Sequence, residues 1–194
     1  MCIRDRDIID PNSVHGPYSQ SWVDEWHRTQ VSEHSYYCSD FKFRKGMVSD
    51  KNTPVYTLHM ADGMWLNKSF KNSILQRIAK CELDGKRYVY SDLGFVLLQQ
   101  VVEKVTELPM DLYLAREFYA PMGLQRTMFL PLTKFTKAEI MPTASNDFLR
   151  RQDICGYVHD ETAACMGGVS GNAGLFSTGR RLSLIHISEP TRPL

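Results

Sequence analysis

The stretch that decides the fold is YSDLGFVLLQQVVEKV, residues 90–105. Leucine or valine recurs at every fourth position from Leu93 to Val105, and further apolar residues widen this stripe. That spacing predicts an amphipathic α-helix whose apolar face packs on a core. Glu103 and Lys104 fall on the opposite side of the predicted helix, which we expect to face solvent.

Tyr90 lies at the N-terminal end of this predicted helix, directly before two residues, Ser91 and Asp92, of types that commonly begin helices. Ser91 or Asp92 can cap the helix by accepting a hydrogen bond from one of its free N–H groups. A tyrosine has a pKa near ~10 in water and is a poor acid–base group there, whereas the positive end of a helix favours the phenolate form. Tyr90 is therefore either a structural residue of a capped helix or a reactive phenol.

The remaining pattern predicts short elements separated by glycine and proline. Residues 7–55 should be rich in loops, with a short helix from Ser21 to Gln30, and residues 55–66 should form two extended pieces joined by a turn at Asp62-Gly63. The pattern then predicts a helix from Ser69 to Cys81, a helix from Met110 to Tyr119, and mostly loop over 125–155. In the helix that begins at Met110, we expect Leu112, Leu114 and Phe118 to pack inward.

Composition argues against several classes of protein. Of the 194 residues, 43% are hydrophobic and 23% charged, and the net charge is +1. We expect no nucleic-acid partner because there is no basic excess, and no transmembrane segment because no run approaches ~18 apolar residues. The cysteines and histidines do not stand at the spacings of a disulfide framework or a zinc site, so we expect no metal and no cofactor.

A second informative segment is GYVHDE, residues 156–161, followed by GGVSGNAGLFST, residues 167–178. Its four glycines between 167 and 174 predict tight turns or a close approach to another element. The segment lacks the Gly-Lys-Ser/Thr ending of a phosphate loop, and the glycine after Ser170 comes one position early for a nucleophile elbow. His159 and Asp160 are candidates for structural hydrogen bonding or for lining a site; adjacent strand residues point to opposite faces and rarely serve one site together.

Three stretches, in the same order and at similar spacing, resemble the serine β-lactamase-related family. They are YSDLGF at 90–95, EFYAPMGLQRT at 117–127, and GYVHDE at 156–161 with GLFST at 174–178. That family includes class C β-lactamases, D-alanyl-D-alanine carboxypeptidases and related esterases. The resemblance covers about residues 55–183, and the chain is also similar to the β-lactamase-like domains fused behind family 3 glycoside hydrolases.

The resemblance implies an α+β fold, in which helices flank an antiparallel sheet and a mostly helical lobe is inserted. This chain would hold mainly that lobe, with helices and loops, few strands, and apolar surface left exposed. Residues 1–6 and 184–194 resemble translated sequencing-adapter read-through. We therefore expect residues 7–183 to be a partial domain of a longer protein.

The family chemistry implied by the resemblance is acyl transfer through an acyl-serine. A helical Ser-x-x-Lys supplies the nucleophile, a Tyr-x-Asn/Asp loop shuttles a proton, and a late Lys/His-Thr/Ser-Gly strand binds the substrate carboxylate. By resemblance Tyr90 is the general acid/base, and Asp92 stands where asparagine is usual. A carboxylate cannot donate hydrogen bonds as an amide does, which weakens the case for β-lactam hydrolysis more than the case for an esterase or peptidase.

The other family motifs are not evident in the sequence. One Ser-x-x-Lys occurs, at Ser39 and Lys42, but it lies among loop-like aromatics and closer to Tyr90 than the family's nucleophile normally stands, so we do not expect it to be catalytic. His159 and Asn172 are candidates for substrate binding. We do not take Asn172-Ala173-Gly174 for the late motif, because the match places it in the earlier glycine-rich segment.

Two functions follow as expectations. The first is the inactive middle of a serine acyl-hydrolase that acts on a small acyl or peptide-like substrate and, by resemblance, is periplasmic or secreted. The second is a non-catalytic, β-lactamase-like accessory or binding module of a glycoside hydrolase. A Ser-x-x-Lys helix upstream in the intact gene would favour the first.

Overall fold

The structure is a computed structural model, and it describes residues 23–32, 35–80 and 90–179, with residues 23–32 and 35–41 described by backbone alone. Seven strands in these residues form three small antiparallel sheets. They are β1 (Val23–Ser32) with β2 (Ser35–Phe43); β3 (Val48–Ser49), β5 (Met64–Asn67) and β4 (Tyr56–Ala61), in that spatial order; and β6 (Pro142–Asp147) with β7 (Gln152–Cys155).

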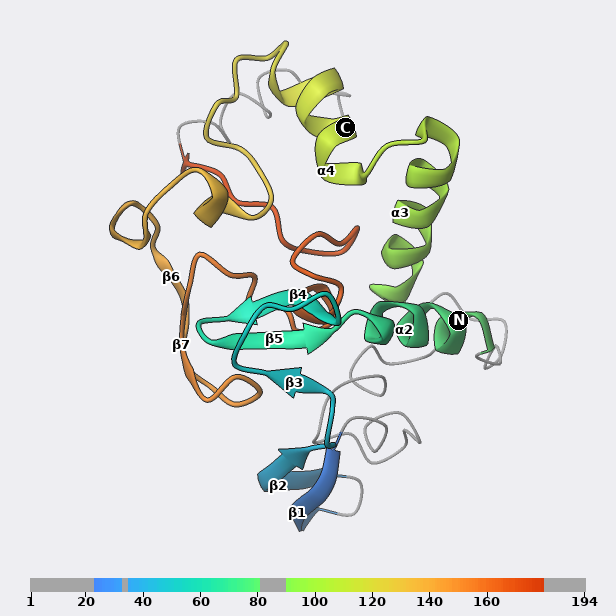
Figure 1. Ribbon diagram of the computed structural model, residues 1–194, viewed down its shortest axis with the longest axis vertical. Coiled ribbons are helices and arrows are strands. Elements are labelled where there is room, and N and C mark those ends of the chain that lie inside the picture. Colours follow the sequence, from blue (N-terminus) through green and yellow to red (C-terminus); the bar gives the residue numbers. More distant parts are fainter. Residues whose placement is uncertain (1–22, 33–34, 81–89, 180–194) are drawn as a thin grey trace, which may run out of the picture.

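The helices of the described residues are short except for two. They are α2 (Ser69–Lys80), α3 (Leu93–Thr106), α4 (Met110–Leu114) and α5 (Glu161–Cys165), with a π-helical turn at Ala115–Tyr119 and 3-10 turns at Pro131–Thr133 and Lys137–Glu139. The β1–β2 hairpin lies at one end of the molecule and α4 at the other, with the β3–β5–β4 sheet between them (Figure 1). The α+β class is confirmed, but the prediction of few strands is wrong.

Local signals placed several elements correctly. The turn at Asp62-Gly63 joins β4 to β5, and Gly63 has the left-handed φ of 58° that such a turn favours in glycine. The predicted helix from Ser69 to Cys81 is α2, and Cys81 lies outside the described residues. The predicted helix of residues 91–106 is α3.

Two segments expected to be helix or loop are hairpins instead. The helix predicted from Ser21 to Gln30 is wrong, because residues 23–32 pair along β2, and a partner strand rich in aromatic residues overrides a weak helical pattern. The loop predicted over 125–155 contains the β6–β7 hairpin. Its connection uses Arg151 at a φ of 55° rather than a glycine, and Asp147 begins the turn by accepting at Oδ1 from the Arg150 N–H at 2.7 Å.

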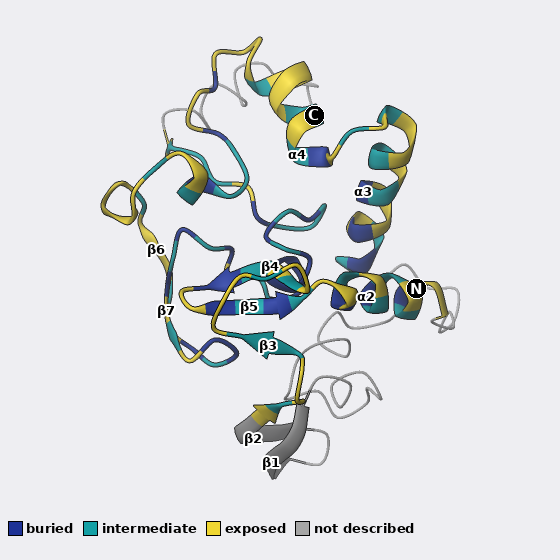
Figure 2. Ribbon diagram, viewed as in Figure 1, coloured by how far each residue is buried: buried dark blue, intermediate teal, exposed yellow. Residues whose placement is uncertain are grey.

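The main core lies between the central sheet, α2 and the first turns of α3. Its most completely buried side chains include Met60, Leu66, Ile74 and Leu93. Buried residues gather on β4, β5 and the end of α3 nearest that sheet (Figure 2). Because α3 runs away from the sheet, only its first turns reach the core.

The prediction for the packed face of α3 is wrong beyond its first turn. Leu98 and Val105 are exposed by 58% and 76%, whereas Gln99 is 1% exposed. Glu103, expected on the solvent side, accepts hydrogen bonds from Gln99 Nε2 at 3.0 Å and from the backbone N–H of Met110 at 3.2 Å. The glycine-rich segment and α4 thus meet the polar side of this helix, and its apolar side faces out.

The helix after α3 also differs from its prediction. Leu112 and Phe118, expected to pack inward, are exposed by 56% and 47%, and Leu114 is half-buried. Met110 at the start of α4 is buried instead. Among the described residues, no helix is both long enough and apolar enough to cross a bilayer.

Candidate functional site

Tyr90 lies where the sequence predicts it, immediately before the first turn of α3. Its side chain is 67% exposed, and its ring centroid is 5.8 Å from that of Phe95. Ser91 is the capping side chain, because its Oγ accepts from the Leu93 N–H at 3.3 Å. Asp92 makes no capping bond through its side chain and contributes its backbone carbonyl, which accepts from the Phe95 N–H at 2.9 Å. The phenol is thus presented to solvent at the positive end of a 14-residue helix.

The glycine-rich segment lies directly against this helix. Gln99 Nε2 donates to the Val169 carbonyl at 3.3 Å, and Gln99 Oε1 accepts from the Gly171 N–H at 3.2 Å. A Cβ at Gly171 would stand 2.0 Å from the Phe95 carbonyl oxygen, so no larger residue fits. Two motifs that lie about 75 residues apart in the sequence therefore meet at the start of α3. Sequence reasoning missed Gln99, whose one signal is a glutamine within an apolar run.

Asp160 and Asn172 belong to one hydrogen-bond network. Asp160 is not in a strand but is the N-cap of α5, and its Oδ1 accepts from the Ala163 N–H at 2.7 Å and from Asn172 Nδ2 at 3.1 Å. Asn172 Oδ1 in turn accepts from the Ser170 hydroxyl at 2.6 Å. These contacts give both residues a structural role, and substrate binding by Asn172 stays a prediction.

A buried ion pair, which sequence reasoning missed, holds the backbone beside His159. Arg150 binds Asp147 through two charge-assisted bonds of 2.8 and 2.6 Å, and both side chains are almost wholly buried. The same guanidinium donates to the carbonyls of Val158 and His159 at 2.7 and 2.6 Å. Burial alone would raise the pKa of the Asp147 carboxyl, but the hydrogen bonds and charge of Arg150 lower it. Nothing in a loop sequence distinguishes this Asp–Arg pair from a solvated one.

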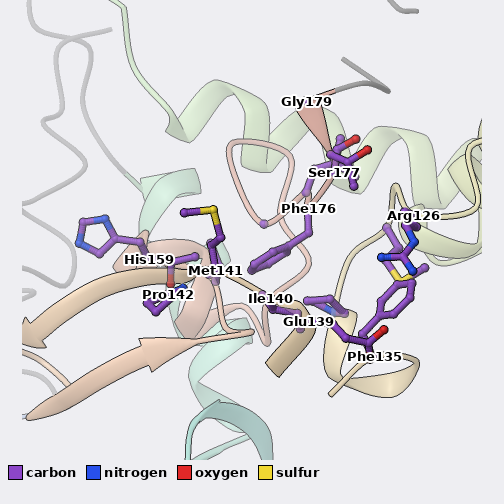
Figure 3. Close-up of a pocket in the computed structure, with 17 residues that line it drawn as sticks. Arg126, Phe135, Glu139, Ile140, Met141, Pro142, His159, Phe176, Ser177 and Gly179 are labelled. Atoms are coloured by element: carbon purple, nitrogen blue, oxygen red, sulfur yellow. The ribbon is translucent and has the colours of Figure 1, made fainter. Parts of the chain in front are cut away.

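A pocket of about 620 Å³ opens beside this pair. Its walls are largely apolar, with Met128, Phe135, Ile140, Met141 and Phe176 among the lining residues. Phe176 lies in the middle of the group, with Met141 and His159 on one side and Arg126 and Phe135 on the other (Figure 3). The ring of His159 points away from the middle, so the predicted substrate-binding residue borders the pocket without filling it.

The pocket and the Tyr90 turn are separate places in the structure. Tyr90 and Asp92 are not among the pocket's lining residues, whereas His159 is. Arg126 and Glu139, which sequence reasoning did not single out, are its charged members. The structure thus brings the glycine-rich segment against Phe95 and Gln99 of α3, the helix that Tyr90 precedes, and places His159 but not Tyr90 at the pocket.

A polar cluster fixes one wall of this pocket. Tyr157 donates its hydroxyl to Asp62 Oδ1 at 3.0 Å, and the Tyr157 hydroxyl oxygen also lies 3.1 Å from His59 Nε2. Lys137 binds the other carboxylate oxygen of Asp62, which ties the 3-10 turn containing Glu139 to the β4–β5 turn.

The protonation of this cluster follows from these contacts. The hydrogen bond from Lys137 holds the pKa of the Asp62 carboxyl below its usual value, and burial lowers the pKa of His59. Burial, together with the bond to Asp62, raises the pKa of the Tyr157 phenol. At neutral pH we therefore expect Asp62 to be charged, and His59 and Tyr157 to be neutral.

The remaining candidates do not form a site in the described residues. Ser39 and Lys42 both lie in β2, and Ser39 falls at a shift in the β1–β2 register. A strand does not place residues three apart on one face as a helical turn does, and their exclusion as the nucleophile pair stays a prediction. Within the described ranges no three His, Cys, Asp or Glu side chains are placed to share a metal ion.

Comparison with known proteins finds a family whose sequence model matches most of this chain. A family model described as Beta-lactamase matches residues 31–185. A "Putative D-alanyl-D-alanine carboxypeptidase" of Salmonella agona (strain SL483) is 33% identical over 182 residues, covering 78% of this chain and 42% of that protein. A protein of the same description from Salmonella schwarzengrund (strain CVM19633) is 36% identical over 130 residues, covering 59% of this chain and 30% of that protein. The chain spans less than half the length of these curated relatives, and no solved structure gives a significant match.

Proposed function

Since the chain belongs to the β-lactamase family, we propose that it forms the central part of a serine acyl-hydrolase and contributes Tyr90 as the general acid/base. The observation that carries this proposal is the exposed Tyr90 phenol at the N-terminus of α3, the helix to which the glycine-rich segment is bonded through Gln99. A helix N-terminus stabilises negative charge, which favours a phenol that must give up its proton.

The proposed reaction proceeds through an acyl-serine. The serine Oγ attacks the substrate carbonyl and loses its proton, the leaving group departs with a proton, and water then hydrolyses the ester. Tyr90 would carry the proton from the serine to the leaving group. The sequence has no Lys/His-Thr/Ser-Gly triplet, and its one Ser-x-x-Lys lies on a strand. We therefore propose that a longer parent protein supplies the helical Ser-x-x-Lys and the Lys/His-Thr/Ser-Gly strand, and we expect the chain alone to be inactive.

The proposed substrate is a small acyl or peptide-like molecule, cleaved by an esterase or peptidase activity in a periplasmic or secreted parent. Support comes from the printed descriptions of the relatives, which name a carboxypeptidase. Asp92 supplies a second argument, because a carboxylate at this position accepts hydrogen bonds but cannot donate them.

A non-catalytic accessory module of a glycoside hydrolase is the second candidate. The observation that favours it is the same strand placement of Ser39 and Lys42, which leaves the described residues without a helical Ser-x-x-Lys. The two candidates differ in one measurable property, the formation of an acyl-enzyme by the intact parent. Labelling of the parent by fluorescent penicillin or turnover of p-nitrophenyl acetate would exclude the accessory role.

The test replaces Tyr90 in the intact parent. Tyr90→Phe removes the titrating hydroxyl and should lower kcat for p-nitrophenyl acetate by about 10²–10⁴-fold, the usual loss for a general acid/base. Tyr113→Phe, a half-buried tyrosine of α4, is the matched control and should retain full activity. Thermal unfolding of both variants should match that of the parent.

Two outcomes would contradict the proposal. Unchanged turnover in the Tyr90→Phe parent would remove Tyr90 from the mechanism. Stoichiometric labelling of Ser39 by fluorescent penicillin, measured on the present chain, would show that the nucleophile lies in this sequence after all.

A further inference from the structure

One edge of the segment Leu175–Thr178 carries main-chain groups without a partner. Phe176 pairs with Met128 in an isolated antiparallel bridge, with both N–H···O bonds at 2.9 Å. Because successive residues of an extended chain direct their N–H and C=O groups to opposite edges, those of Leu175 and Ser177 are directed away from Met128. Within the part of the chain that the structure describes, these four groups make no hydrogen bond.

This unpaired edge borders the 620 Å³ pocket. Every residue from Gly174 to Gly179 lines the pocket, whereas the paired segment contributes only Arg126 and Met128, which alternate. A strand seen from its face presents alternate residues, so a lining of six consecutive residues indicates that the backbone itself adjoins the cavity.

The rest of the pocket suits apolar side chains. Phe135, Ile140 and Met141 lie around Phe176 (Figure 3), and the volume falls within the ~300–1,000 Å³ typical of small-ligand sites. Arg126 lies with its guanidinium carbon 5.0 Å from the centroid of the Phe135 ring. The carboxylate of Glu139 accepts from the N–H and hydroxyl of Thr136, at 3.1 Å each. Those hydrogen bonds, together with the charge of Arg126, lower the pKa of the Glu139 carboxyl, so the two charged side chains of the pocket offset each other.

We infer that this pocket binds a short extended peptide, which adds as a strand to the edge of Leu175–Thr178 and buries apolar side chains against Phe135 and Phe176. Main-chain donors and acceptors in alternation recognise another main chain, and the apolar walls select its side chains. The inference does not depend on the proposed chemistry, because Tyr90 does not line the pocket.

The test measures binding of a fluorescein-labelled pentapeptide, LVFVD, to the full chain by fluorescence anisotropy. Saturable binding is expected, and the same peptide N-methylated at alternate residues should bind about tenfold more weakly, because it lacks the main-chain donors. Octanoate, an apolar anion with no peptide group, should not displace the peptide at equal concentration.

A pair of substitutions at Ser177 tests the edge from the protein side. Ser177→Pro and Ser177→Ala both remove the hydroxyl that lies 2.8 Å from Thr127 Oγ1, but only proline also removes the main-chain N–H. Peptide affinity should fall about tenfold between the alanine and the proline variants. Should the proline variant fail to fold, the N-methylated peptide decides alone. Equal binding of the methylated and unmethylated peptides, displacement by octanoate, or no saturable binding would overturn the inference.

Discussion

The Arg150 cluster and the Tyr90 turn are held in place in opposite ways. The Arg150 cluster comprises the Arg150 and Asp147 side chains and the carbonyls of Val158 and His159, all joined by short bonds in a buried setting. The Tyr90 turn, residues 90–92, has a largely exposed phenol, and its Ser91 side chain accepts a capping bond from the Leu93 N–H. The pocket wall is thus fixed by interior polar bonds, while the proposed reactive group stands in solvent.

This difference has a practical consequence. A change in the Arg150 cluster should alter stability first, because it leaves buried polar groups without partners. A change at Tyr90 should alter chemistry and leave stability nearly untouched, because exposed positions away from buried bonds rarely contribute more than ~0.5 kcal/mol. The substitutions below test the contrast, beginning with the largest expected effect.

Arg150→Met should cause the largest loss of stability. It leaves the Asp147 carboxylate buried without its cation and removes the donor to two carbonyls. Breaking a buried ion pair in this way typically lowers the free energy of unfolding by about 3–5 kcal/mol. Urea unfolding measures the loss, and a loss below ~1 kcal/mol would show that the cluster does not hold the wall.

The double variant Arg150→Met/Asp147→Leu and the pH dependence are the controls. The double variant should be more stable than Arg150→Met, because no unpaired charge remains buried. The pKa of Asp147 is lowered in the folded state. The pair therefore contributes its full stability above the unfolded carboxyl's pKa of ~3.9 and loses it as the pH falls through the folded pKa. This acid-dependent loss should be absent from the double variant, and an identical pH profile would contradict the assignment.

Gly171→Ala should have the next largest effect. The added Cβ would meet the Phe95 carbonyl oxygen at 2.0 Å, so the glycine-rich segment must move away from α3. Overpacking of this kind costs about 1–3 kcal/mol. Gly94→Ala is the matched control on the same helix, because nothing lies within 4 Å of its added Cβ. It should leave stability unchanged or raise it by up to ~1 kcal/mol, and equal losses in the two variants would refute the close contact.

Elements with a local signal could be predicted from the sequence, and those set by long-range pairing could not. The turn at Asp62-Gly63 and the bounds of α2 and α3 follow from glycine chemistry and from helical spacing. The β6–β7 turn begins at a common turn residue, Asp147, but the pairing of its two strands depends on contacts between them rather than on a local pattern. The β1 strand depends on its partner β2, which a local helical pattern does not reveal.

The candidate site divides in the same manner. Tyr90 before α3 and capping by Ser91 are local features, and the sequence predicts both positions, with Ser91 as one of two alternatives. The approach of Gly171 to Phe95 joins segments far apart in the chain. The residues of the Arg150 cluster are close in sequence, but their burial depends on how the surrounding chain packs. The family resemblance locates motifs along the chain, but it does not say which of them line the pocket.

The smallest effect is expected at Leu98 of α3, whose neighbour Gln99 has the opposite environment. Gln99 is 1% exposed and bonds the glycine-rich segment, whereas Leu98 is 58% exposed. Gln99→Leu should lower the free energy of unfolding by about 1–3 kcal/mol, because it leaves the partly buried N–H of Gly171 without its acceptor. Leu98→Gln should change it by no more than ~0.5 kcal/mol. A hydrophobic pattern read without the structure predicts the reverse order, so urea unfolding of these two variants decides which face of α3 is packed in solution.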